Sequence, residues 1–160
     1  MKHPRTPRPL VNPIVYAMES ARKFTPDQLA QLMAPNTAAV EALRTGYFNA
    51  DHWRILADAF NIAEALARPP VNLANDHAYK FEEAHCVLFA LSEQYRDRRT
   101  WTPRAPQLAT IKDAMELFEI QLSYVGQGEF ERAVDRLRRQ ITQAIRGNGA
   151  KNVRLVHAVA

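Results

Sequence analysis

Cysteine is almost absent from this sequence, since Cys86 is the only one among 160 residues. A single cysteine excludes an internal disulfide framework and a zinc site built from several cysteines. Long apolar runs are missing too, because no stretch approaches the roughly 18 uninterrupted apolar residues of a membrane span. The basic first nine residues are not followed by the apolar block of about 7–15 residues that a secretory signal needs. We therefore expect a cytoplasmic protein with no membrane partner.

Glycine and serine are also scarce, with five glycines in the whole chain. The glycine-rich loops that cradle phosphates are absent, and no serine lies in the glycine-flanked turn typical of a catalytic nucleophile. The nearest approach to a metal-binding pattern is Glu82 with His85, three residues apart on one helical face. A di-metal bundle site needs a second Glu-x-x-His, which this chain does not contain. We predict a non-enzymatic protein with no cofactor and no bound metal.

What the sequence does contain is the pattern of a folded helical domain. Hydrophobic residues make up 47% and charged residues 24% of the chain, which is ordinary for a folded protein with one core. Helix starts are clearly marked. Thr25 and Gln28 have the spacing of a capping box, and Asn49 is a helix cap with Phe48 before it and Trp53 at the matching later position. Asn12 followed by Pro13 marks a further start, so helices are predicted to begin near residues 13, 26 and 50.

Apolar residues recur at helical spacing over 106–125 and again over 130–146. The first stripe comprises Leu108, Ile111, Met115, Phe118, Leu122 and Val125. Because a short Gly-Gln-Gly segment separates the two stretches, we expect an antiparallel αα-hairpin. The predicted fold is all-α, a single-domain bundle of five or six helices. Its helical domain spans 12–147, between a basic flexible arm at 1–11 and a tail at 148–160, where 153–157 can form a strand only by pairing with another segment.

Positive charge is concentrated at the two ends of the chain. Residues 1–23 and residues 129–160 each carry a net charge of +4, whereas the residues between them carry −4. Basic ends on an acidic body fit an anionic partner such as nucleic acid. They fit equally well an arrangement in which the ends pack on the acidic body of the same or a second molecule.

Residues 24–62 suggest one specific DNA-binding geometry. Pro35 is expected to break the first helix, which gives a helix over 24–33, a turn at 34–36 and a second helix over 37–45 closed by Gly46. The Thr25-x-x-Gln28-Leu29-Ala30 opening, the anchors Val40 and Leu43 and the closing Gly46 make this stretch resemble the λ-repressor-like helix-turn-helix family. The resemblance implies a DNA-binding regulator whose second helix lies in the major groove. Its candidate contacts are Asn36, Thr37 and Arg44.

The last predicted helix offers a second anion-binding face. Arg132, Arg136, Arg139 and Arg146 follow one another at intervals of 4, 3 and 7 residues, so they share one side of that helix. We call these four residues the arginine flank. Such a row can follow a phosphate backbone and release its counterions. The alternative is a solvated helix face whose charges complement the helix dipole.

Two functional hypotheses follow. The first is a non-enzymatic regulator that binds nucleic acid through residues 36–45 or through the arginine flank. The second is a protein-interaction or oligomerisation module, for example a homodimer, that uses the apolar stripe of 108–125 or the C-terminal tail and has no role in nucleic-acid binding.

Overall fold

The computed structural model describes residues 13–146, which form an all-α fold, as the sequence predicts. The elements are α1 (Pro13–Ser20), α2 (Pro26–Thr45), α3 (Ala50–Ala67), the 3-10 helix η1 (Asn75–His77), α4 (Tyr79–Arg98), α5 (Ala105–Tyr124) and α6 (Gln127–Ile145). In the described range no helix is both long and apolar enough to cross a membrane. The predicted basic arm at 1–11, the tail at 148–160 and the strand at 153–157 lie outside the described residues.

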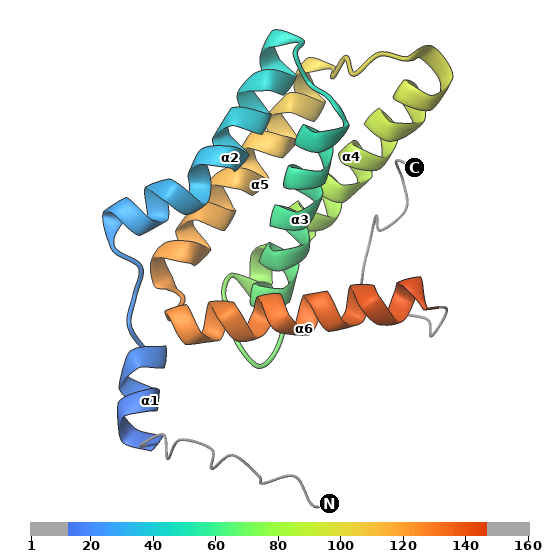
Figure 1. The fold of residues 1–160 in the computed structure, drawn as a ribbon. Helices are drawn as coiled ribbons and strands as arrows, with labels where there is room; N and C mark the ends of the chain where they lie inside the picture. The colour runs from blue at the N-terminus through green and yellow to red at the C-terminus, as the bar shows by residue number, and fades with distance from the viewer. Residues whose placement is uncertain (1–12, 147–160) are drawn as a thin grey trace, which may run out of the picture.

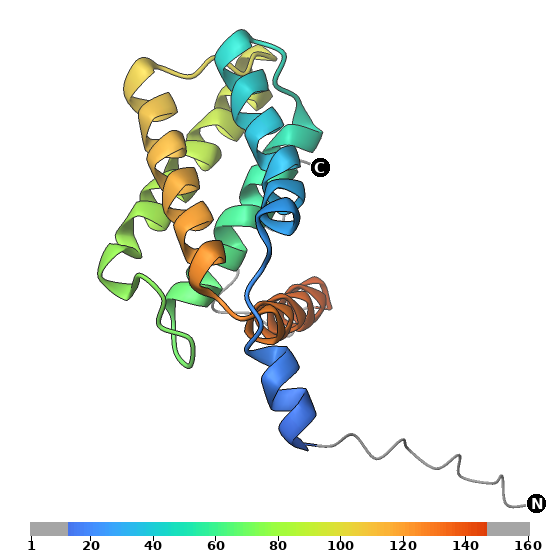
Figure 2. The same ribbon diagram turned by 90° about the vertical axis from the view of Figure 1, so that its left-hand side faces the viewer.

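Four helices, α2 to α5, make up the body of the molecule. They lie side by side, and α6 runs across one end of them (Figures 1 and 2). The short helix α1 stands beyond that end and packs on α6. This arrangement brings Arg22 and Lys23, which follow α1, and the arginines of α6 to the same end of the bundle.

The helix starts are those expected from local sequence. The hydroxyl of Thr25 accepts a hydrogen bond from the backbone N–H of Gln28, and the Gln28 side chain accepts one from the Thr25 N–H, which completes the capping box. The side chain of Asn49 accepts from the N–H groups of Asp51 and His52, each at 3.0 Å. These bonds satisfy donors that the first helical turn leaves unpaired. Two of the predicted helix caps are therefore confirmed.

The core is apolar and lies around α3. Its largest fully buried side chains include Phe60 of α3, Phe81 and Leu88 of α4, and Ile111 and Leu122 of α5. Burial of one such side chain contributes about 1.5–3 kcal/mol. Most of the apolar stripe predicted over 108–125 points into this core. Most of the stripe is therefore covered by helices of the same chain and is not available to a second molecule.

The predicted antiparallel hairpin of the last two helices is wrong. The helices themselves form, but α6 crosses the end of α3 instead of running back along α5 (Figure 1). The connecting residues Val125 and Gly126 are both extended, and Val125 is fully buried. The inner face of α5 is already occupied by α2, α3 and α4, so the buried residues Ala133 and Leu137 of α6 pack on the end of α3.

The predicted turn at 34–36 is also wrong, because α2 continues through Pro35. A proline removes one helical hydrogen bond, here to the carbonyl of Gln31, and costs about 3 kcal/mol in a helix interior. Buried residues on both sides of it, Met33, Ala39 and Leu43, keep the two halves of α2 on the same core. The helix bends near its middle rather than breaking (Figure 1).

Gln121 joins α5 to the connection between α3 and α4. Its side-chain amide donates to the carbonyl of Ala63, at 3.2 Å, and to the carbonyl of Leu73, at 2.8 Å. The residue is almost fully buried. The bond to Leu73 holds the irregular segment 68–74 against α5, and the bond to Ala63 joins α5 to α3.

Replacing Gln121 with leucine removes both bonds at nearly constant volume. We expect the free energy of unfolding to fall by about 1–3 kcal/mol, because the buried carbonyl of Leu73 loses its donor. The control is Gln31→Leu, at an exposed position of α2, where a change within about 0.5 kcal/mol is expected. Urea unfolding measures both, and equal stabilities for the two variants would contradict the role given to Gln121.

Candidate nucleic-acid interface

The three candidate contacts in α2 are not brought together as a DNA-reading surface. Asn36 is buried, with 7% of its surface exposed, and its side-chain amide donates to the carbonyl of Leu32 at 3.1 Å. Thr37 is exposed. Arg44 is exposed but paired, since its guanidinium donates to both oxygens of Glu41 at 2.5 and 2.8 Å. The hydrogen bond to Arg44 holds the pKa of Glu41 below its usual value.

Residues 24–46 therefore lack the geometry of a helix-turn-helix. The predicted second helix, 37–45, is the second half of one continuous α2, and its inward side is part of the core. Asn36 cannot reach a base edge, because its amide is turned toward the helix that carries it. The prediction failed because it treated Pro35 as a break, whereas packing on both sides of the proline overrides that local preference.

Three of the four residues of the arginine flank lie on the surface because the opposite side of α6 packs on the bundle. Ala133 and Leu137 face α3, which leaves Arg132, Arg139 and Arg146 exposed along one side. At 1.5 Å per residue these three side chains span roughly 21 Å of helix. These three arginines therefore share one exposed side of the helix, as their spacing predicts, whereas Arg136 is half-buried.

The exposed members of the flank differ in their surroundings from four other surface arginines. Arg44, Arg54, Arg96 and Arg138 each lie within 4 Å of a carboxylate three residues before them in the sequence. In the part of the chain that the structure describes, no carboxylate lies within that distance of Arg132, Arg139 or Arg146. Their positive charge is therefore not neutralised by a contact with another described side chain.

Arg136 has a different environment from the rest of the flank. It is half-buried and faces α3, where it lines a pocket of about 190 Å³ together with Asn61, Glu64 and Arg68. Glu64 is 4% exposed and His85 is 2% exposed. One oxygen of Glu64 is 3.8 Å from the Arg68 guanidinium, and the other is 3.9 Å from the imidazole of His85. Arg136 therefore belongs to a buried polar cluster and is removed from the proposed contact surface.

Sequence reasoning did not identify this cluster. In the sequence His85 stands out only for its spacing from Glu82, and the i, i+4 spacing of Glu64 and Arg68 is the one local signal of an ion pair. Nothing in the sequence indicates that α6 crosses α3 at this point. The single cysteine, Cys86, is exposed.

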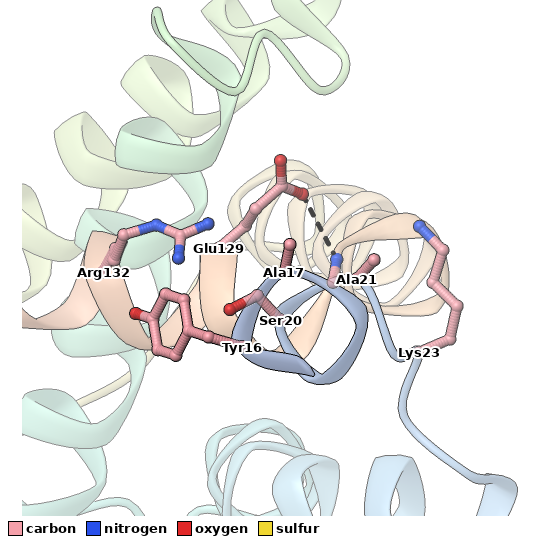
Figure 3. Close-up of a pocket in the computed structure, with 8 residues that line it drawn as sticks. Tyr16, Ala17, Ser20, Ala21, Lys23, Glu129 and Arg132 are labelled. Carbon is pink, nitrogen blue, oxygen red and sulfur yellow. Dashed lines mark hydrogen bonds between the residues drawn. The ribbon is translucent and has the colours of Figure 1, made fainter. Parts of the chain in front are cut away.

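An open pocket of about 520 Å³ lies between α1 and the start of α6. Tyr16 and Arg132 lie on one side of it and Lys23 on the other (Figure 3). The two helices approach closely here because α6 begins with glycines. A Cβ on Gly126 would be 2.5 Å from the Ser20 carbonyl oxygen, and one on Gly128 would be 2.6 Å from the Ser20 Cβ.

Gly128→Val is expected to displace α1 without unfolding the bundle, because α1 contributes no buried residue. Trypsin should cleave after Arg22 or Lys23 several-fold faster than in the unmodified chain. The midpoint of thermal unfolding should fall by less than about 4 °C, the shift produced by roughly 1 kcal/mol at this size. The control is Ala38→Val at an exposed position of α2, and equal cleavage rates in the two variants would contradict the close approach.

Comparison with known proteins adds no family assignment. No family model matches this chain, and no curated protein or solved structure does so either. Function is therefore inferred from the geometry and charge of the described residues.

Proposed function

We propose that this chain is a non-enzymatic nucleic-acid-binding protein whose contact surface is the exposed part of the arginine flank. The observation that supports this most is the row formed by Arg132, Arg139 and Arg146, exposed on one helix side and without a carboxylate contact among the described residues. Guanidinium groups bind phosphate oxygens through paired N–H donors, and each contact releases condensed counterions.

The spacing of these three arginines suits contacts to the phosphate backbone of a nucleic acid rather than to base edges. Arg132 and Arg139 are two helical turns apart, about 10.5 Å, and so are Arg139 and Arg146. A straight row of cations at this spacing can lie along one strand. Contacts to phosphate determine position and affinity but carry little sequence information. We therefore expect binding with weak sequence preference.

The charge distribution also favours binding of a polyanion at the end of the bundle where α1 and α6 lie. The described residues 129–146 carry five arginines and three acidic residues, a net charge of +2, and α1, which Arg22 and Lys23 follow, packs on α6 at the same end of the bundle (Figure 2). The residues between 23 and 129 carry −4. A polyanion is therefore attracted to the α1–α6 end and repelled by the remaining body.

The second hypothesis is a protein-interaction or oligomerisation module with two possible contact surfaces, and one of these is largely buried. The apolar stripe of 108–125 is largely buried within its own bundle, so it is not available to a partner. The other surface, the C-terminal tail, lies outside the described residues. We therefore keep nucleic-acid binding as the function that the described residues support best.

The double variant Arg132→Glu with Arg139→Glu tests the proposal against a control with the same change in net charge, Arg54→Glu with Arg96→Glu. Binding to a mixed-sequence DNA duplex is measured by fluorescence anisotropy. For three phosphate contacts, affinity of the unmodified chain should fall roughly 40-fold between 50 and 200 mM salt. The flank variant should bind at least about 10-fold more weakly at low salt, with a shallower salt dependence.

The control should keep near-normal binding, because its arginines are already paired on α3 and α4. Equal losses in the two double variants would assign binding to overall charge rather than to the flank. Undetectable binding by the unmodified chain at low salt would overturn the proposal.

A further inference from the structure

The open pocket between α1 and the start of α6 adjoins the arginine flank, because Arg132 lines both. Its volume is about 520 Å³ (Figure 3). Tyr16, which is 51% exposed, contributes an aromatic ring, and Ala17 and Ala21 add small apolar surfaces. Pockets that hold one small molecule have volumes of roughly 300–1,000 Å³. The pocket therefore has room for one planar ring system beside a cation that we assign to phosphate binding.

Backbone hydrogen bonds hold the two walls of the pocket together. The N–H of Gln127 donates to the carbonyl of Arg22 at 2.8 Å, and Lys23 forms a β-bridge with Gly126. The side-chain amide of Gln127 also donates to the carbonyl of Lys23, at 3.2 Å. These bonds join the residues that follow α1 to the start of α6. The pocket is therefore formed before a ligand binds, which lowers the entropic cost of binding.

The carboxylate of Glu129 also lines the pocket. One of its oxygens accepts a hydrogen bond from the N–H of Gly126, at 3.4 Å (Figure 3). A negative charge at this place repels a phosphate group, whereas a carboxylate can accept further hydrogen bonds from N–H donors. An uncharged ring with N–H groups on its edge therefore suits the interior of the pocket better than a phosphate does. The phosphate is attracted instead to the guanidinium of Arg132.

A nucleobase has this combination of an aromatic face and a polar edge. Every base can stack on a tyrosine ring, and adenine, cytosine and guanine have an amino group on the edge. In a duplex, neighbouring base pairs cover both faces of a base, and turning the base out of the stack costs free energy. A single strand presents its bases at a lower cost. The pocket therefore favours single-stranded nucleic acid.

We propose that the pocket accepts one base of a single-stranded nucleic acid, stacked on Tyr16, while phosphates of the same strand bind Arg132 and Arg139. The inference rests on the proposed function and specifies its ligand, a single strand in preference to a duplex. Because every base has an aromatic face, the preference for particular bases stays weak.

The first test compares the full chain's affinity for a mixed-sequence DNA single strand with its affinity for the duplex of the same sequence. Fluorescence anisotropy at low salt should show at least about 5-fold tighter binding of the single strand. Charge alone favours the duplex, whose phosphates are more densely spaced. Equal affinities, or tighter binding of the duplex, would overturn the inference and leave the proposed function standing.

The second test removes the ring on which the base is placed. Tyr16→Ala should weaken binding of the single strand at least about 5-fold and change binding of the duplex by less than about 2-fold, whereas Tyr16→Phe should bind both like the unmodified chain. The matched control is Tyr47→Ala. Tyr47 is 81% exposed and lies in the connection between α2 and α3, at the other end of the bundle (Figure 1), so its loss should change neither affinity.

Trypsin cleavage after Arg22 or Lys23 separates loss of the ring from displacement of α1. Tyr16→Leu keeps an apolar side chain without an aromatic face, and it should lose single-strand binding while its cleavage rate stays that of the unmodified chain. Normal single-strand binding by Tyr16→Leu, or an equal loss in Tyr16→Phe or Tyr47→Ala, would overturn the stacking on Tyr16. If the unmodified chain binds neither form of DNA at low salt, the proposed function itself fails.

Discussion

Burial around α3 is the constraint on which the rest of the structure depends. This helix packs on α2, α4, α5 and α6, and its residues Leu56, Phe60, Ala63 and Leu66 are completely inaccessible to solvent. Because the inner surface of the bundle is filled in this way, α6 has only the end of α3 left to pack on. The exposed arginines, the buried polar cluster and the position of α1 all follow from that one crossing. Each proposed surface is therefore a product of the same core.

Local signals determined what could be predicted from the sequence. The caps at Thr25 and Asn49 and the end of α2 at Gly46 depend on residues within one helical turn, so their chemistry can be seen without the fold. The turn expected at Pro35 and the hairpin expected at Gly126 both depend on what packs against the segment. In α2, the apolar residues on either side of the proline share one core. In α6, the neighbour that the helix would have packed on is already covered by other helices.

In the candidate site, too, some features follow from local sequence and others depend on contacts between distant segments. The spacing of Arg132, Arg139 and Arg146 predicts their common side, and the structure places them there on the surface. The spacing alone cannot separate Arg136 from them, because its environment is set by Glu64, which lies 72 positions earlier in the chain. Asn36 was misplaced for a related reason: its polar side chain suggested a surface role, whereas the bend of α2 turns it inward. Contacts between distant segments, rather than composition, decide these assignments.

The placement of Arg136 also restricts how α6 can move. The apolar contact of this helix with α3 rests mainly on Ala133 and Leu137, two side chains of modest size. Sliding α6 along its axis by one turn, about 5.4 Å, would carry the guanidinium of Arg136 out of the pocket that holds the carboxylate of Glu64. The place of Arg136 in this pocket therefore limits how far α6 can slide where its apolar contact alone is weak.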